Sequence, residues 1–498
     1  MTAEFWNTEP LRDAFAARHM GRVLRHYRAH SHHTGRHGPR GVPQSLLGQW
    51  LGLTQAQISR IETGPPVTDL VNLVHYARVL GMPAGWLWFS LPEALPAPQV
   101  QAGTVDDERR AVSPDVHRSQ AAWRTTRRYL NTHRAQLAAV ASQLYPANAR
   151  LASAPLLTTA LWCPPEPVLL DQVRLTWTGS PKLPLFDGSE PEAGQALPLR
   201  APSRRFDRYT QAVRYIAAPS LFENRPSYRL TGIEWRADGS GELSFGLATY
   251  FDKLDVSEAI GHEFAAAAQC TESAVSWGAL PLRRLINDPF DLDLRAVVPA
   301  ITTLLLRVRP SGEATFLLHW RDPGKVATAG GLYDTIPAGE FQPSTVMGDP
   351  AGPDFDLWRN IVRELNEELL GAPEYDGSGS RPLDYERWPL YRSLQRARAA
   401  GRLRAYCFGV GCDALTLAAT IPSAMVIADD VFDELFGEVV QTNAEGVTVT
   451  RWNGQDTTAG IPFTEQNITR FLTSEPMAPP GAACLALAWK HRALLLGS

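Results

Sequence analysis

The chain has 498 residues, a hydrophobic fraction of 44% and a formal net charge of −4. This length is typical of about three domains, and the composition is that of a globular protein able to bury a core. The cysteines are scattered and form no CxxC pair, which argues against a disulfide framework or a cysteine zinc site. The polar, acidic N-terminal residues do not look like a secretory leader, and no apolar run is long enough to cross a bilayer. We therefore expect a cytoplasmic protein that makes no use of a membrane.

Charge is unevenly distributed along the chain. Between Arg12 and Arg60 the basic residues are all arginines, and Asp13 is the only acidic residue. A locally basic segment in a slightly acidic chain is typical of an appended nucleic-acid-binding module. A solvated basic surface is the other interpretation of this charge.

Residues 10–92 are predicted to form an all-helical domain. Apolar spacing indicates helices over residues 20–30, 43–51, 54–61 and 69–80. Pro43 suits the first turn of its helix, and Thr54 is a good N-cap for the next. A Gly-Pro-Pro sequence then ends the third helix.

The second and third of these helices have the spacing of a helix-turn-helix. The first would support the second, which presents polar side chains to base edges in the major groove. Glutamine can contact adenine through two hydrogen bonds, and arginine can contact guanine or phosphate. The candidate DNA-binding residues are Gln44, Thr54, Gln55, Gln57, Ser59 and Arg60.

The stretch PQSLLGQWLGLTQAQISRIETG resembles the Cro/repressor-type helix-turn-helix family. The resemblance implies that Gln44, at the start of the supporting helix, positions Gln55 at the start of the recognition helix. It also implies a homodimer on double-stranded DNA, with half-sites about 34 Å apart. One departure is the His-, Arg- and Gly-rich insertion at residues 31–41, which is either a spacer or a further DNA contact. A helical bundle used for protein contacts is the competing interpretation of the module.

Residues 93–204 are predicted to be a linker followed by one long helix. The segment 92–103 has linker composition, and residues 115–144 carry apolar side chains near one helix face. The proline-rich stretch 164–202 is expected to be irregular.

Residues 205–498 alternate between strand and helix patterns, which indicates an α/β or α+β domain. We expect strands over residues 228–235, 242–250, 300–309, 314–320, 403–411 and 416–427. We expect helices over residues 256–268, 355–370, 463–472 and 482–495.

The helix expected over residues 355–370 carries three glutamates near its end. Glu364 and Glu368 share one face, and Glu367 lies beside them. Converging carboxylates can bind a hard divalent cation such as Mg²⁺ through oxygen ligands. A solvated polar face of an amphipathic helix is the alternative.

The surroundings of this helix resemble the Nudix superfamily. The loop IPAG at Gly339 follows a predicted strand pair, and the helix reads Arg363-Glu364-Leu-Asn-Glu367-Glu368. The resemblance implies a Nudix-like fold in which the glutamates bind Mg²⁺, and the Mg²⁺ activates water and neutralises a diphosphate.

The sequence departs from the Nudix pattern at three points. An insertion separates the IPAG loop from the helix, Thr345 stands where the pattern has a glutamate, and the final glycine is displaced to Gly371. Glu445, in a loop before a predicted strand, is either an additional acid of the site or an ordinary loop residue.

The predicted fold is therefore multidomain, with an all-α helix-turn-helix bundle, a helical connector and a C-terminal Nudix-like α/β domain. We expect a bacterial DNA-binding transcriptional regulator whose C-terminal domain senses a nucleotide-type or phosphorylated small-molecule effector. An active Mg²⁺-dependent Nudix hydrolase of nucleoside diphosphate derivatives is the main alternative. A scaffold protein is the third, and the eroded motif favours the sensor over the enzyme.

Overall fold

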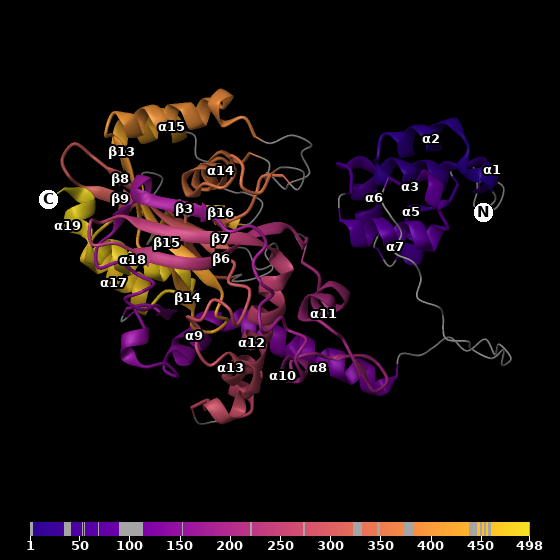
Figure 1. The fold of residues 1–498 in the computed structure, drawn as a ribbon, viewed down its shortest axis with the longest axis horizontal. Helices are drawn as coiled ribbons and strands as arrows, with labels where there is room; N and C mark the ends of the chain where they lie inside the picture. The colour runs from indigo at the N-terminus through magenta and orange to yellow at the C-terminus, as the bar shows by residue number, and fades with distance from the viewer. Residues whose placement is uncertain are drawn as a thin grey trace. The chain divides into compact units, whose positions relative to one another are not determined.

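The computed structural model describes most of the chain in detail. The described residues are 3–33, 41–51, 53, 55–67, 69–88, 113–151, 153–219, 222–271, 274–321, 331–345, 349–372, 383–437, 446–448, 451–452, 455–456 and 460–497. They form two compact units, residues 1–110 and 111–498 (Figure 1). The chain is therefore multidomain, with a helical smaller unit and a larger unit built on mixed sheets. No described helix is long and apolar enough to span a membrane.

The smaller unit is a bundle of short helices in its described part. They are α1 (Ala3–Trp6), α2 (Glu9–Ala16), α3 (Met20–Ala29), α5 (Gln44–Leu51), α6 (Gln55–Thr63) and α7 (Leu70–Leu80), with the 3₁₀ turn η1 (Ala84–Trp86). Trp6, Leu24, Leu47 and Ile58 belong to one buried core that joins all parts of the bundle. The helices predicted at residues 20–30, 43–51, 54–61 and 69–80 are confirmed within one or two residues at their ends.

Helix α6 packs closely against α3 because of a glycine. A side chain at Gly21 would collide with the backbone carbonyl of Ile61. Glycine lets the two helix backbones approach directly, which fixes α6 on the rest of the bundle.

The larger unit is organised around two long central strands, β8 (Ala300–Val308) and β15 (Ala419–Ala428). They pair in parallel over their whole length, with Thr420 opposite Ala300 and Ala428 opposite Val308. Both strands are almost wholly buried, which explains their continuous apolar sequence. They hold the centre of the main mixed sheet.

Shorter strands extend this main sheet on both sides. They are β1 (Leu156–Leu157), β2 (Val168–Leu169), β9 (Ala314–Phe316), β12 (Ala338–Glu340), β13 (Leu403–Cys407), β14 (Gly411–Asp413) and β19 (Ile461–Pro462). The N-terminal end of β8 pairs with β12, and its C-terminal end pairs with β9. One edge of β15 is likewise shared by β14 and β13.

Four smaller sheets complete the described strands. β3 (Val173–Trp177) pairs with β7 (Gly241–Thr249), which pairs with β6 (Pro226–Trp235). β10 (Leu318–Arg321) pairs with β11 (Tyr333–Thr335) and β16 (Gly446–Thr448). The two-stranded sheets are β4 (Leu199–Ala201) with β5 (Arg204–Arg205), and β17 (Arg451–Trp452) with β18 (Gln455–Asp456).

Helices cover both faces of the main sheet (Figure 1). Alternate residues of the central strands enter two different cores: Leu305 and Met425 enter one, and Leu304 and Ala424 enter the other. The first core includes α12 (Tyr250–Gln269), α14 (Leu357–Leu370), α15 (Pro389–Ala399) and α16 (Asp429–Phe436). The second includes α17 (Glu465–Thr473), α18 (Pro479–Lys490) and α19 (Arg492–Leu496). The result is a layered arrangement with the sheet in the middle.

The single helix predicted over residues 115–144 and the irregular stretch predicted over residues 164–202 differ from their predictions, whereas the predicted linker at residues 92–103 lies outside the described residues. The helix is broken at His133 into α8 (Pro114–Thr132) and α9 (Arg134–Ser142). The proline-rich stretch contains β2, β3, β4 and the short helix α10 (Pro191–Gly194) rather than irregular chain. Pairing with strands that come much later in the chain stabilises these segments, and local composition does not predict such pairing. The remaining helices of this unit are α11 (Tyr209–Ile216) and α13 (Pro281–Ile286).

Helix α14 is defined by clear end groups. The Asp356 carboxylate accepts a hydrogen bond from Arg359 N at 2.8 Å, which caps the N-terminus. Gly371 ends the helix in the left-handed conformation, with φ 66°. The displaced glycine of the sequence motif therefore has a structural role as a C-cap.

Candidate functional site

The polar side of α6 is exposed in the smaller unit. Gln55 and Arg60 are exposed, Gln57 and Ser59 are half-buried, and Ile58 between them is fully buried in the bundle core. Helix α6 therefore presents its polar side to solvent and packs its apolar side into the core of the bundle. Thr54 and residues 34–40 of the predicted insertion lie outside the described residues.

Gln44 contacts the opposite end of α6 from Gln55. Its Nε2 donates to Oε2 of Glu62 at 2.9 Å. Arg28 on α3 donates from Nη2 to the same oxygen at 2.8 Å and from Nε to Oε1, and its Nη1 donates to Val42 O at 2.7 Å. The side chain of Glu62 is only 3% exposed. This buried network joins α3, α5 and α6, so the amide of Gln44 takes part in holding the two predicted DNA-binding helices together.

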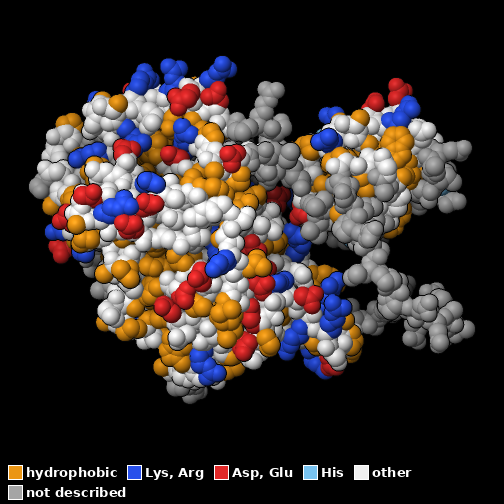
Figure 2. All heavy atoms as spheres, in the orientation of Figure 1, with side chains coloured by type: hydrophobic (Ala, Val, Ile, Leu, Met, Phe, Trp, Pro, Cys, Tyr) orange, Lys and Arg blue, Asp and Glu red, His pale blue; other side chains and the backbone are white. Residues whose placement is uncertain are grey.

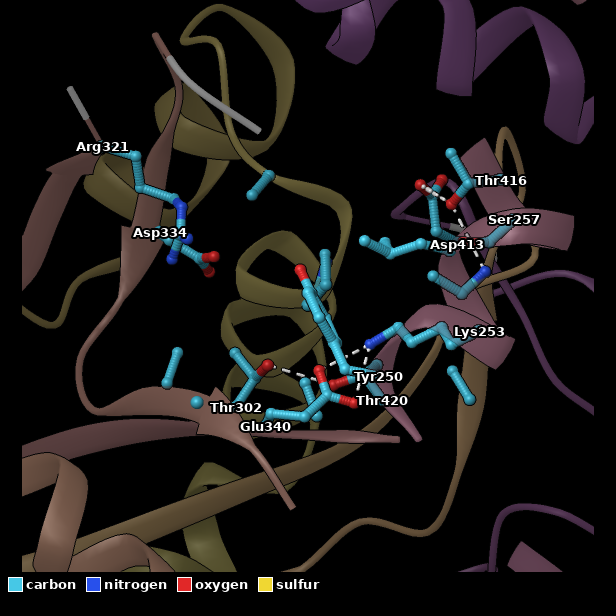
Figure 3. Close-up of a pocket in the computed structure, with 18 of the residues that line it drawn as sticks. Tyr250, Lys253, Ser257, Thr302, Arg321, Asp334, Glu340, Asp413, Thr416 and Thr420 are labelled. Atoms are coloured by element: carbon cyan, nitrogen blue, oxygen red, sulfur yellow. Dashed lines mark hydrogen bonds and ion pairs between the residues drawn. The ribbon is translucent and has the colours of Figure 1, made fainter. Parts of the chain in front are cut away.

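The larger unit contains a cavity of about 260 Å³ that is lined by charged side chains of both signs. Arg321 and Asp334 lie on one side of it, and Lys253, Asp413 and Thr416 lie on the opposite side (Figure 3). Helices α12 and α14, strands β8, β12 and β15, and the start of α18 all contribute to its wall.

The glutamates predicted from the α14 motif all line this cavity: Glu364, Glu367 and Glu368. The backbone N–H of Ala338 donates to Oε2 of Glu368 at 3.1 Å. A side chain at Gly339 would occupy the place of the Glu364 carboxylate, so the glycine of the IPAG loop lets this carboxylate lie against the loop. The structure thus brings together the two parts of the motif that the insertion separates in sequence.

The fit of these residues to Mg²⁺ is incomplete. Within the described part of the chain, no three His, Cys, Asp or Glu side chains converge closely enough to hold a metal ion. Glu368 is 3% exposed and is held by a backbone N–H, whereas Mg²⁺ requires near-ideal octahedral oxygen geometry. The three carboxylates of α14 therefore share a cavity without forming a metal centre. Glu445 lies outside the described residues.

Arg363 and Thr345 of the motif region are structural. Arg363 Nη2 donates to Gln342 O and to Asn360 Oδ1, both at 2.6 Å. Arg363 therefore fixes the loop that precedes α14. Thr345, at the position where the Nudix pattern has a glutamate, is buried at 3% exposure.

Lys253 and Glu340 form an ion pair on the wall that faces α14. Lys253 Nζ lies 2.7 Å and 3.0 Å from the two carboxylate oxygens (Figure 3). Hydroxyl groups lie beside this pair, where Thr302 on β8 and Thr420 on β15 are joined at 3.0 Å. This part of the cavity can bind polar ligand atoms through both charge and hydroxyl hydrogen bonds.

The tight loop after β14 forms another part of the wall and is held by its own aspartate. Asp413 accepts from Leu415 N at 2.9 Å and from the Thr416 hydroxyl at 2.7 Å. Complete burial raises the pKa of the Asp413 carboxyl, and the charge of Arg134 opposes this effect. Arg283 and Arg295, both buried, donate to backbone carbonyls of the same loop.

A buried polar network lies behind the cavity wall, between α8, α11 and α12. Arg127 Nη1 donates to Tyr209 Oη at 3.1 Å, and Tyr209 Oη lies 3.1 Å from Nδ1 of His262. Since a guanidinium can only donate, the Tyr209 oxygen is the acceptor of the bond from Arg127. Burial, assisted by the charge of Arg127, lowers the pKa of His262 to about 3, so the imidazole is neutral at physiological pH. Its ring stacks on Trp123 with centroids 5.4 Å apart.

Sequence reasoning missed the contribution of α12 and α9 to the cavity. Asp255, Glu258 and His262 recur at helical spacing on α12, and each is less than 9% exposed. Ionisable residues on a buried face of an otherwise apolar helix were the available signal, because such groups are rarely buried without partners. Arg134 had no comparable local signal, since its burial depends on the break between α8 and α9.

Surface charge gives no sign of a polyanion-binding face on the larger unit in the orientation of Figure 2. Basic and acidic side chains are interspersed over the visible face of residues 111–498. In the smaller unit, by contrast, Arg12, Arg18, Arg22 and Arg25 on or beside α2 and α3 are all exposed.

No family model matches the sequence, and no curated protein matches it. A solved structure described as a NUDIX hydrolase from Alicyclobacillus acidocaldarius is 15% identical over 41% of this chain and 96% of its own length, with a TM-score of 0.23. A TM-score this low does not establish a shared fold.

Proposed function

We propose that this protein binds double-stranded DNA through α6 and acts as a transcriptional regulator. The observation that supports this proposal is the outward polar face of α6, with Gln55 and Arg60 exposed, on a helix anchored by buried Ile58 and Glu62. Helix α5 packs beside α6 as the supporting helix. These are the requirements of a helix-turn-helix, in which the N-terminal residues of the second helix contact bases.

A single module of this kind contacts only a few base pairs. The proposal therefore includes a homodimer that binds two half-sites about 34 Å apart. Genome-wide mapping of the DNA bound by the full chain tests both points together. A paired sequence element with helical-turn spacing is the expected result, and scattered sites without a common element would contradict it.

Gln55→Ala and Arg60→Ala are each expected to weaken binding to the mapped DNA. Loss of one base contact costs about 1–3 kcal/mol, which is roughly 5- to 150-fold in affinity. Thr63→Ala is the matched control, because Thr63 is exposed at the C-terminal end of the same helix, where its hydroxyl bonds to Ser59 O. Fluorescence anisotropy with a labelled fragment measures all three. Unchanged affinity in both test variants would show that α6 does not contact the bases.

The cavity of the larger unit is proposed to bind the effector of this regulator. Its mixed wall of carboxylates, cations and hydroxyls supports a charged, polar ligand of the nucleotide-type or phosphorylated class, held in a Nudix-like site. Ligand binding regulates DNA binding only if the ligand has different affinities for two states of the protein.

A Mg²⁺-dependent hydrolase is the second candidate, favoured by the location of Glu364, Glu367 and Glu368 in one cavity. The sensor proposal predicts that nucleoside diphosphate derivatives incubated with Mg²⁺ are not turned over. Phosphate release and chromatography of the products measure this directly. Turnover that disappears in Glu367→Gln and Glu368→Gln would replace the sensor with the enzyme.

A further inference from the structure

One carboxylate at the cavity wall joins two helices that are separated by a break. Arg134, the first residue of α9, donates from Nη2 to both oxygens of Glu258 at 3.0 Å and 3.1 Å. Arg127, on α8, lies with Nη1 3.3 Å from Oε2 of the same glutamate. We refer to Arg127, Glu258 and Arg134 as the Glu258 bridge.

The Glu258 bridge spans the junction of α8 and α9. The backbone leaves the helical conformation at His133, with φ −112° and ψ 19°, although His133 N still donates to Tyr129 O and Leu137 N donates to His133 O, both at 2.9 Å. All three side chains of the bridge are 7% exposed or less. Removing one partner of a buried ion pair is strongly destabilising, so the bridge is a strong constraint on this junction.

Only part of the bridge is accessible from the cavity. Glu258 and Arg134 line the cavity, whereas Arg127 belongs to the protein interior behind it. A ligand can therefore contact one end of the bridge while the other end is fixed to α8. Helix α8 begins at Pro114 and is the first described helix after residue 88.

The chemistry of Arg134 indicates what the ligand presents to it. Its buried Nε–H has no hydrogen-bond partner among the described residues. A buried donor without a partner is destabilising, and an acceptor atom of a ligand would satisfy it.

The local charge points in the same direction. The bridge contains two guanidinium groups and one carboxylate, and the charges of Arg134 and Arg283 act on the nearby carboxyl of Asp413. His262, which contacts Tyr209 behind the bridge, is neutral. The three side chains of the bridge therefore carry a formal charge of +1 among themselves, which an anionic oxygen at Arg134 would balance.

We propose that an anionic oxygen of the ligand binds Arg134 in place of Glu258 and thereby loosens α8 from α9. This inference rests on the proposed function, since α8 is the first described helix after residue 88. Loosening α8 is the step through which an occupied cavity would affect DNA binding. No covalent step is involved, only an exchange of partners at one guanidinium.

Hydrogen–deuterium exchange of the full chain tests the bridge without any ligand or DNA. Glu258→Gln is expected to increase amide exchange in α8 by roughly tenfold or more, because the junction loses its charged constraint. Glu263→Gln is the matched control on the same helix, since the Glu263 carboxylate accepts from Leu282 N and Arg283 N at the start of α13. Its effect should be confined to α13. Equal exchange of α8 in wild type and Glu258→Gln would overturn the proposal.

Two simple anions test whether a ligand oxygen replaces Glu258 at Arg134, and they distinguish a phosphate from a carboxylate as the group that does so. Inorganic phosphate or acetate, at constant ionic strength with chloride as the reference, should increase α8 exchange in the wild type and have no effect in Arg134→Gln. A response to phosphate alone identifies a phosphate ligand, and a response to acetate identifies a carboxylate. No response to either anion would overturn the anionic part of the proposal. If Glu258→Gln does not fold, Arg134→Lys is the second variant. It keeps the positive charge but loses the contact with both oxygens of Glu258, so amide exchange in α8 should increase by less than is expected for Glu258→Gln.

The link to DNA is tested last and separately. If the cavity and the DNA-binding helix are coupled through the bridge, DNA bound to the smaller unit is expected to alter α8 exchange in the wild type, and this effect should be absent in Glu258→Gln. A chain that binds no DNA refutes the proposed function while the bridge experiments remain valid. DNA binding that leaves α8 exchange unchanged refutes the regulatory inference alone.

Discussion

Glu62→Ala is expected to unfold the smaller unit while the larger unit stays folded. The substitution leaves the guanidinium of Arg28, whose side chain is 16% exposed, and the amide of Gln44 without their shared acceptor. Breaking a buried pair in this way costs about 3–5 kcal/mol, a large share of the stability of about 5–15 kcal/mol that is typical of a domain. Scanning calorimetry of the full chain should show loss of one transition, with loss of binding to the mapped DNA.

Two further variants separate the ion pair from general damage to the bundle. Glu9→Gln changes an exposed glutamate of α2 and should leave the transition in place. The double change Arg28→Met with Glu62→Leu should recover much of the lost stability, because no unpaired charge remains buried. If Glu62→Ala lowered stability no more than Glu9→Gln, the buried network would not hold the bundle together.

Arg283→Met is expected to produce the largest loss of stability in the larger unit. The side chain is 0% exposed, lies over the ring of Phe264 and donates to Tyr145 Oη at 3.1 Å, to Ala414 O at 2.7 Å and to Leu415 O. Methionine fills similar space but leaves these acceptors without a donor, at about 1–3 kcal/mol each. The second calorimetric transition should move to lower temperature by several degrees.

The neighbouring residue supplies the control for this prediction. Arg284 is exposed, and Arg284→Met should change the transition little. Amide exchange of residues 413–418 should rise in Arg283→Met only, because Arg283 anchors that loop against the cavity. Equal effects of the two substitutions would mean that the buried hydrogen bonds of Arg283 contribute no more than a surface side chain.

Much of the secondary structure was predictable because its signal is local. The helices from Met20 to Leu80 and the amphipathic helix α14 were found from apolar spacing and end residues. The buried strands β8 and β15 were found from continuous apolar runs. Errors occurred where pairing is long-range: β2 pairs with β13, and β3 pairs with β7, across segments that composition alone does not connect.

The candidate site was predictable in one part only. The motif placed Glu364, Glu367 and Glu368 near Gly339, and the structure puts them in one cavity. Their incomplete fit to a metal could not be read from spacing, because it depends on how each carboxylate is held by its neighbours. The DNA-contacting roles of Gln55, Gln57, Ser59 and Arg60 stay a prediction, now with a geometry in which Gln55 and Arg60 are exposed.

Local sequence was enough to show which segments become helices and buried strands. It also identified α6 and α14 as the helices that carry the polar residues proposed to be functional. Both are set by side-chain periodicity and end caps, which involve near neighbours in the chain. The meeting of Arg127, Glu258 and Arg134 arises only in the packed protein, since more than 120 residues separate the arginines from the glutamate. Burial makes the interactions among these charged side chains strong. Because burial depends on how the whole chain packs, no local sequence pattern predicts it.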